Sequence, residues 1–145
     1  QCFYEALQDD FKIYINQVVK NIKAMSDEFS KLECLIVSGT TDNHLILLDV
    51  KSSFGITGSE AEKLLDKINI TVNKNTIPND TESPMVSSGI RLGSPAMTSR
   101  GLKEDDFVKI GQIIAEALKN HGNKEILDNL KIQVLELTSK YPLWY

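Results

Sequence analysis

The sequence predicts an α+β fold in which helices cover a small, mainly antiparallel sheet. Apolar residues recur at helical spacing in one long segment near the start of the chain and in two segments at its end. Between these segments lie short apolar runs that are typical of protected strands. The order contains too few strand–helix–strand crossovers for a doubly wound parallel sheet, so an antiparallel sheet with helices on one side is favoured.

The first predicted element is a long helix. One helical face is formed by residues at alternating intervals of four and three: Phe11, Ile15, Val18, Ile22, Met25 and Phe29. Asp9 or Asp10 is the expected cap. We therefore divide the chain into a helix over residues 1–31 and a small domain over residues 32–145.

The middle of the chain alternates extended segments with one helix. Strands are expected over residues 32–37 and 44–50, joined as a hairpin by the turn-rich stretch SGTTDN. Thr57 and Glu60 have the spacing of a capping box, which predicts a helix to about Lys67. A third extended piece follows at Ile70–Asn73.

The last third contains a loop, a strand and two helices. Two prolines and several turn formers predict a loop over residues 75–88, and a strand resumes at residues 88–92. Acidic residues at 104–106 suit the N-terminal end of a helix that ends at Gly122. A final helix should run from about Lys124 to Lys140.

The composition of the chain argues against several classes of partner. The chain has 145 residues, and its 16 basic and 20 acidic residues give a net charge of −4. A nucleic-acid footprint would need a basic patch, and a membrane span would need about 20 apolar residues in a row, so neither partner is expected. Cys2 and Cys34 have no metal-ligand spacing, and we expect no metal site and a reducing, cytoplasmic compartment.

Arg91 is the first candidate for ligand binding. Its guanidinium is always charged and presents a rigid fork that suits a carboxylate. No acidic residue lies between Glu82 and Glu104, and Gly89 and Gly93 leave space two positions away on the same face of the strand. A bound carboxylate and a tertiary ion pair are both compatible with this pattern.

The segment Asn73-Lys74-Asn75 is the second candidate. An extended backbone aims both amides to one face, where they could bind the edge of a planar heterocycle, although loop-capping asparagines fit as well. Lys74 has polar neighbours that would not activate its amine, so an ordinary loop lysine is favoured over a Schiff-base lysine.

The remaining ionisable candidates have simpler explanations. His44 at the start of a strand is interpreted as a turn-edge residue, and His121 as a residue near a helix C-terminus. Arg100 is expected to pair locally or to cap a loop. The chain has none of the standard Walker, GxGxxG or GxSxG motifs, so no catalytic residue is assigned within it.

Three stretches resemble the C-terminal part of serine hydroxymethyltransferases: VSGTTDNHLILLDV, GITGSEAEKLLDKINITVNKNTIPND and SPMVSSGIRLGSPAMTSRG. The resemblance implies an aminotransferase-like enzyme that depends on pyridoxal phosphate. Such enzymes interconvert serine and glycine and pass a one-carbon unit to tetrahydrofolate. The resemblance further implies that this chain lacks the large domain, which holds the cofactor and the Schiff-base lysine. We therefore expect the chain alone to be inactive.

The resemblance also implies binding roles for individual residues. Arg91 matches the arginine that binds the substrate carboxylate, and Asn75 matches a residue that contacts the pterin ring of the folate. Ser83, Pro84 and Met85 match a Ser-Pro-Phe step in the folate site, with methionine where phenylalanine is usual. Methionine can fill the same apolar space.

The implied assembly is a homodimer or higher homo-oligomer of the full-length enzyme. The chain begins at Gln1, and its first residues lack the features of a signal peptide, so we expect it to be part of a longer protein. The alternative is a stand-alone, non-catalytic α+β module that binds a ligand.

Overall fold

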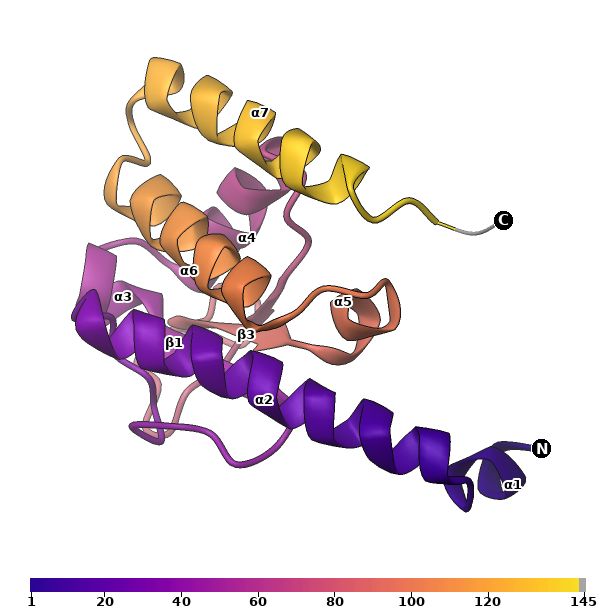
Figure 1. Ribbon diagram of the computed structural model, residues 1–145. Helices are drawn as coiled ribbons and strands as arrows, with labels where there is room; N and C mark the ends of the chain where they lie inside the picture. Colours follow the sequence, from indigo (N-terminus) through magenta and orange to yellow (C-terminus); the bar gives the residue numbers. More distant parts are fainter. Residues whose placement is uncertain (144–145) are drawn as a thin grey trace.

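The computed structural model describes residues 1–143 and contains seven helices and three strands over that range (Figure 1). In chain order they are α1 (Cys2–Ala6), α2 (Asp9–Lys31), β1 (Leu45–Asp49), α3 (Val50–Phe54), α4 (Gly58–Lys67), β2 (Asn73–Asn75), β3 (Gly89–Gly93), α5 (Pro95–Ser99), α6 (Glu104–Lys119) and α7 (Lys124–Ser139).

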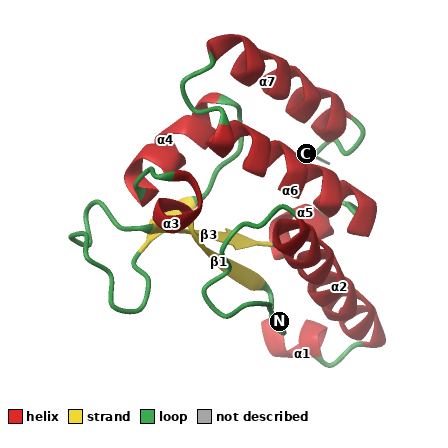
Figure 2. Cartoon of the chain, turned by 90° about the vertical axis from the view of Figure 1, so that its left-hand side faces the viewer, coloured by secondary structure: helices red, strands yellow, loops and turns green. Residues whose placement is uncertain are grey.

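The sheet is small and entirely antiparallel. Its strand order is β1-β3-β2, so β3 lies in the centre and pairs with both neighbours. Ile46, Leu48, Ile90 and Leu92 are buried, and α4, α6 and α7 lie on one side of the strands (Figure 2). The predicted α+β class with helices over one face of an antiparallel sheet is therefore confirmed.

The long helix α2 has two different halves. Its C-terminal half packs against α6 and buries Ile22, Met25 and Phe29 in the core. Its N-terminal end extends beyond the body of the molecule, and Phe11 and Ile15 are each 38% exposed (Figure 1). Val18 between the two halves is fully buried, and Tyr14 Oη donates to the carbonyl oxygen of Pro95 in α5. The predicted apolar face is thus only partly buried. The predicted cap is wrong, because the N-cap is Gln8 and both aspartates lie in the first turn.

The first predicted strand, over residues 32–37, is wrong. The segment forms an isolated bridge between Ile36 and Leu48 and two further backbone hydrogen bonds to β1. Glu33 has a positive φ of 58° and Gly39 one of 75°. These two turns leave only a short extended stretch beside β1, and it lies antiparallel to β1 as the predicted hairpin requires.

The other differences concern short elements. Asp49 accepts a hydrogen bond from Ser52 N at 2.9 Å and caps α3, which was not predicted. The third strand lies at Asn73–Asn75 rather than at 70–73, and α5 was not predicted. The predicted capping box of α4 is confirmed: Thr57 Oγ1 accepts from Glu60 N at 3.2 Å, and Glu60 Oε2 accepts from Thr57 N at 2.8 Å.

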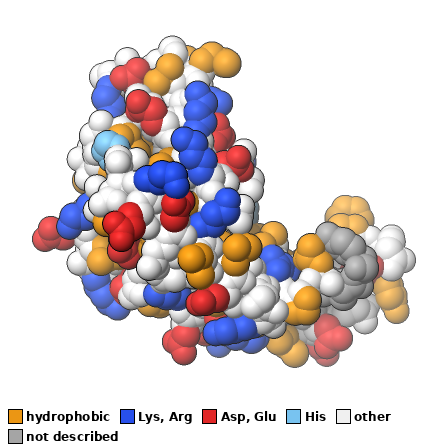
Figure 3. Space-filling view, turned by 90° about the horizontal axis from the view of Figure 1, so that it is seen from above, with side chains coloured by type: hydrophobic (Ala, Val, Ile, Leu, Met, Phe, Trp, Pro, Cys, Tyr) orange, Lys and Arg blue, Asp and Glu red, His pale blue; other side chains and the backbone are white. Residues whose placement is uncertain are grey.

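The two C-terminal helices form the outer part of the fold. The helix α7 packs on α6 and buries Leu130, Val134 and Leu137. Seen from above, the surface carries acidic and basic side chains interspersed with one another (Figure 3). Across residues 1–143, no helix is both long and apolar enough to cross a membrane.

Candidate functional site

The candidate site lies on the face of the sheet opposite the helices. Side chains alternate between the two faces of a strand, and Ile90 and Leu92 of β3 point into the core. Arg91 therefore lies on the opposite face and is exposed. It stands opposite Leu47 of β1 on one side and Asn73 of β2 on the other.

The Arg91 guanidinium has a neutral partner. Its Nη2 donates to Oδ1 of Asn73 at 3.5 Å, a long hydrogen bond between cross-strand neighbours. Within residues 1–143, no carboxylate lies within ion-pair distance of Arg91. Residues 1–143 thus do not form the tertiary ion pair that the sequence allowed. The remaining N–H donors of the Arg91 guanidinium are available to a ligand.

The two glycines that flank Arg91 play different roles. A side chain at Gly89 would meet Ile77 Cγ2 at 2.7 Å and the carbonyl oxygens of Asn75 and Leu48 at 3.0 Å. The expectation that Gly89 clears space for a ligand is therefore wrong, because the loop after β2 fills that space. Gly93 is exposed and has only ordinary contacts around it.

A hollow of about 370 Å³ opens on the Gly93 side of Arg91. Its wall includes His44, Leu45, Asn73 and Arg91. The His44 carbonyl oxygen accepts a hydrogen bond from Ser94 N at 3.1 Å, so the backbone at His44 is fixed to the turn after β3. The lining of the hollow is more polar than apolar and includes one cation and one amide, which is a suitable composition for a small carboxylate ligand.

Asn73 and Asn75 lie on the same face of β2, as predicted. The register pairs Asn73 with Arg91 and Asn75 with Gly89. Asn75 Nδ2 donates to the carbonyl oxygen of Thr76 at 2.8 Å, so its amide is oriented at the point where the strand becomes the loop. The two amides thus have different partners, one on the arginine and one on the local backbone.

Ser83, Pro84 and Met85 form the exposed end of the loop between β2 and β3. The Ser83 carbonyl oxygen accepts from both Val86 N and Ser87 N at 2.9 Å, which closes a tight turn. Met85 is 77% exposed at the tip. Sequence reasoning missed Asp80, which organises this loop from inside; its place among the turn formers of PND is the one local signal for such a role.

Lys74 is engaged by a carboxylate on a neighbouring helix. Glu62 of α4 accepts from Lys74 N at 3.0 Å and pairs with its Nζ at 3.4 Å. The Lys74 backbone hydrogen bond is the main cause that lowers the pKa of Glu62. This contact fixes β2 to α4. Lys74 therefore lies in a strand and not in a loop as predicted, because its backbone pairs with β3 and its side chain with Glu62.

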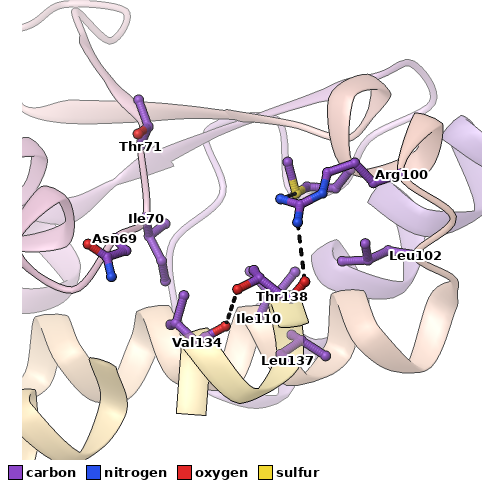
Figure 4. Close-up of a pocket in the computed structure, with 10 residues that line it drawn as sticks. Asn69, Ile70, Thr71, Arg100, Leu102, Ile110, Val134, Leu137 and Thr138 are labelled. Carbon is purple, nitrogen blue, oxygen red and sulfur yellow. Dashed lines mark hydrogen bonds between the residues drawn. The ribbon is translucent and has the colours of Figure 1, made fainter. Parts of the chain in front are cut away.

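Arg100 caps the C-terminal end of α7 and not a loop. It donates to the carbonyl oxygens of Thr138 at 3.2 Å and of Tyr141, and it borders a separate, largely apolar cavity of about 310 Å³ (Figure 4). Arg91 and Arg100 therefore have distinct roles in the structure.

The comparisons with known proteins agree on one family. The family model described as serine hydroxymethyltransferase matches residues 1–114. The chain belongs to the serine hydroxymethyltransferase family. It is similar to the serine hydroxymethyltransferase of Mycoplasma mobile, with 54% identity over 143 residues, which cover 97% of this chain and 34% of the relative. The serine hydroxymethyltransferase of Lactobacillus gasseri is 49% identical over 144 residues, or 99% of this chain and 35% of the relative.

The chain thus spans about a third of the length of the curated serine hydroxymethyltransferases that it matches. The resemblance predicted from three sequence stretches is confirmed. One of those stretches contains Asn75 at the end of β2, and another contains the Ser83–Met85 turn and Arg91.

Proposed function

We propose that this chain is the substrate-binding part of a serine hydroxymethyltransferase that interconverts serine and glycine and transfers a one-carbon unit to tetrahydrofolate. In this proposal Arg91 binds the α-carboxylate of the amino acid. The observation that carries the proposal is the position of Arg91, a cation on an open sheet face beside a hollow. Among residues 1–143 its only side-chain partner is a neutral amide.

The proposed role of Arg91 is positioning. A guanidinium fork can hold both carboxylate oxygens at once, which fixes the orientation of the substrate as well as its place. Asn73 limits the rotation of the fork from the neighbouring strand. Asn75 and the turn formed by Ser83, Pro84 and Met85 would contact tetrahydrofolate from the adjoining loop.

Lys74 does not fit the lysine of a pyridoxal phosphate site. Such a site needs a lysine amine that is available to the cofactor, but Lys74, the lysine of the sheet, is engaged by Glu62. We therefore propose that a large domain outside this chain holds pyridoxal phosphate, which supplies the electron sink of the reaction. The homodimer would likewise form in the full-length enzyme.

Substitution of Arg91 tests the proposal. In the full-length enzyme, Arg91→Lys and Arg91→Ala should each lower kcat/KM for serine about 10- to 100-fold, because a charge-assisted hydrogen bond made by the fork is lost. Lys109→Ala is the control, since Lys109 is an exposed cation on α6. The isolated 145-residue chain provides the background, for which we expect no turnover.

A second comparison isolates the carboxylate. Serinamide lacks the negative charge, so the Arg91 variants should lose affinity for serine but not for serinamide. An unchanged affinity for serine in both Arg91 variants would show that the carboxylate binds elsewhere.

A further inference from the structure

The loop between β2 and β3, residues 76–88, contains neither helix nor strand, although the proposed folate contacts lie at its start and at its tip. Backbone groups outside regular structure still need hydrogen-bond partners. A loop of this length without internal partners would sample many conformations. The partners within this loop therefore decide how well it can bind a ligand.

The Asp80 carboxylate supplies these partners. Its Oδ2 accepts from Ile77 N at 3.1 Å and from Ser88 N at 2.9 Å. Its Oδ1 accepts from Glu82 N at 2.9 Å and from Ser88 Oγ at 2.6 Å. Four donors match the roughly four lone-pair sites of a carboxylate. One side chain thus joins the start, the middle and the end of the loop.

The electrostatics agree with this geometry. The hydrogen bond from the Ser88 hydroxyl, together with those from the three amides, holds the pKa of Asp80 well below its usual range. The carboxylate is therefore charged at any working pH of the protein, and all four acceptor positions remain available.

The second half of the loop is also anchored independently of Asp80. Gly58 N and Ser59 N at the start of α4 donate to the carbonyl oxygens of Ser87 and Val86. Lys51 of α3 forms an ion pair with Glu82. Loss of Asp80 should consequently loosen the interior of the loop without detaching it from the domain.

We propose that Asp80 is a positioning residue for tetrahydrofolate: it holds the Ser83–Met85 turn at a fixed place relative to Asn75, so that both can contact the same ligand. This inference rests on the proposed function. Asp80 itself is not expected to touch the ligand, because its carboxylate is fully used within the loop.

The test compares Asp80→Asn with Asp66→Asn in the full-length enzyme. In Asp80→Asn an amide nitrogen replaces one acceptor oxygen and faces N–H donors. We expect the KM for tetrahydrofolate to rise about tenfold, with the KM for serine and kcat at saturating folate changed less than about twofold. Asp66 on α4 is exposed and makes no side-chain hydrogen bond within residues 1–143, so Asp66→Asn should change nothing.

Amide hydrogen exchange reports on the loop directly. The amides of Ile77, Glu82 and Ser88 should lose protection in Asp80→Asn, whereas those of β1 and β3 should keep it. Asp80→Glu, which keeps the charge, should restore part of the protection and of the folate KM. An equal rise of the KM for serine and for folate would indicate a general structural role and overturn the inference.

Asn75→Ala separates this inference from the proposed function. If Asn75→Ala raises the folate KM and Asp80→Asn does not, Asp80 does not position the ligand, although the folate site stands. If neither variant changes the folate KM, the folate site does not lie on this loop. Both the inference and the proposed folate contacts then fail, whereas the proposed role of Arg91 is decided by the Arg91 variants.

Discussion

Single residues decide how closely the loop, the sheet and α4 approach one another. Gly58 is the first residue of α4, and a side chain there would lie 2.3 Å from the carbonyl oxygen of Gly89. Since Gly58 N also donates to the carbonyl oxygen of Ser87 at 2.8 Å, the helix cannot move away without losing that hydrogen bond. The position is therefore restricted to glycine by contact and not by φ.

Gly58→Ala should destabilise the protein by roughly 1–3 kcal/mol, the usual cost of overpacking. Gly122→Ala is the matched control, because no atom of the described residues lies within 4 Å of the added methyl group, and its effect should stay within about 0.5 kcal/mol. Urea unfolding of the two variants measures both effects. Equal stability of the two variants would show that α4 can shift freely against β3.

At the scale of elements, the sequence predicted the long helices better than the short helices and the stretch at 32–37. The helices α4, α6 and α7 were expected because capping residues and apolar spacing act locally, within one or two turns. The stretch at 32–37 has the composition of a strand, but the turns at Glu33 and Gly39 decide its structure, and they depend on packing against β1.

The site shows the same division between local and tertiary information. The sequence around Arg91 was enough to identify it as a candidate for ligand binding. The alternation of side chains along a strand predicted that Asn73 and Asn75 share one face. The hydrogen bond between Arg91 and Asn73 depends on the register of β2 against β3, which no local pattern fixes. The role of Asp80 depends on Ser88, eight residues away, and is visible only once the loop is folded.

Arg100 provides a prediction about one element, α7. Its Nε donates to the carbonyl oxygen of Tyr141 at 3.0 Å and its Nη2 to that of Thr138 at 3.2 Å, so a single fork satisfies the C-terminal end of the helix. A second contact is the hydrogen bond from the Tyr141 hydroxyl to Asp106 Oδ2 at 2.7 Å. Together these contacts hold α7 against α5 and α6.

Arg100→Lys should loosen the last turn of α7, because a lysine keeps the charge but cannot reach both carbonyl oxygens with one rigid fork. We expect a loss of about 1–2 kcal/mol in the free energy of unfolding. Hydrogen exchange should show the loss of protection at Lys140 and Tyr141, with the amides of α2 unchanged. Full protection at both amides in the variant would mean that the Tyr141–Asp106 contact alone holds the helix end.

Across the whole molecule, several acidic side chains accept hydrogen bonds from backbone amides or from polar side chains. In the described part of the chain, residues 1–143, five carboxylates have a lowered pKa, in each case mainly through hydrogen bonds: Glu28, Glu60, Glu62, Asp80 and Glu104. For Glu60, Glu62 and Glu104, the largest contribution to the lowered pKa is a hydrogen bond from a backbone amide: that of Thr57, of Lys74 and of Glu104 itself, respectively. For Glu28 and Asp80, it is a hydrogen bond from a side chain, that of Gln112 and of Ser88, respectively.

These groups predict that acid destabilises the fold. Because each pKa is lower in the folded than in the unfolded chain, the unfolded chain binds protons first as the pH falls. The stability that they contribute is present above the unfolded values of 3.8 for Asp and 4.5 for Glu, and it is lost as the pH falls through the folded values.

Urea unfolding between about pH 6 and pH 3 should therefore show a steady decrease in the free energy of unfolding. Most of this decrease should persist in about 0.5 M NaCl, because salt screens ion pairs more than short hydrogen bonds to amides and hydroxyls. Asp80→Asn should make the dependence on pH shallower, and Asp66→Asn should leave it unchanged. A decrease that disappears in salt would instead assign the acid sensitivity to surface ion pairs such as Lys12–Asp9.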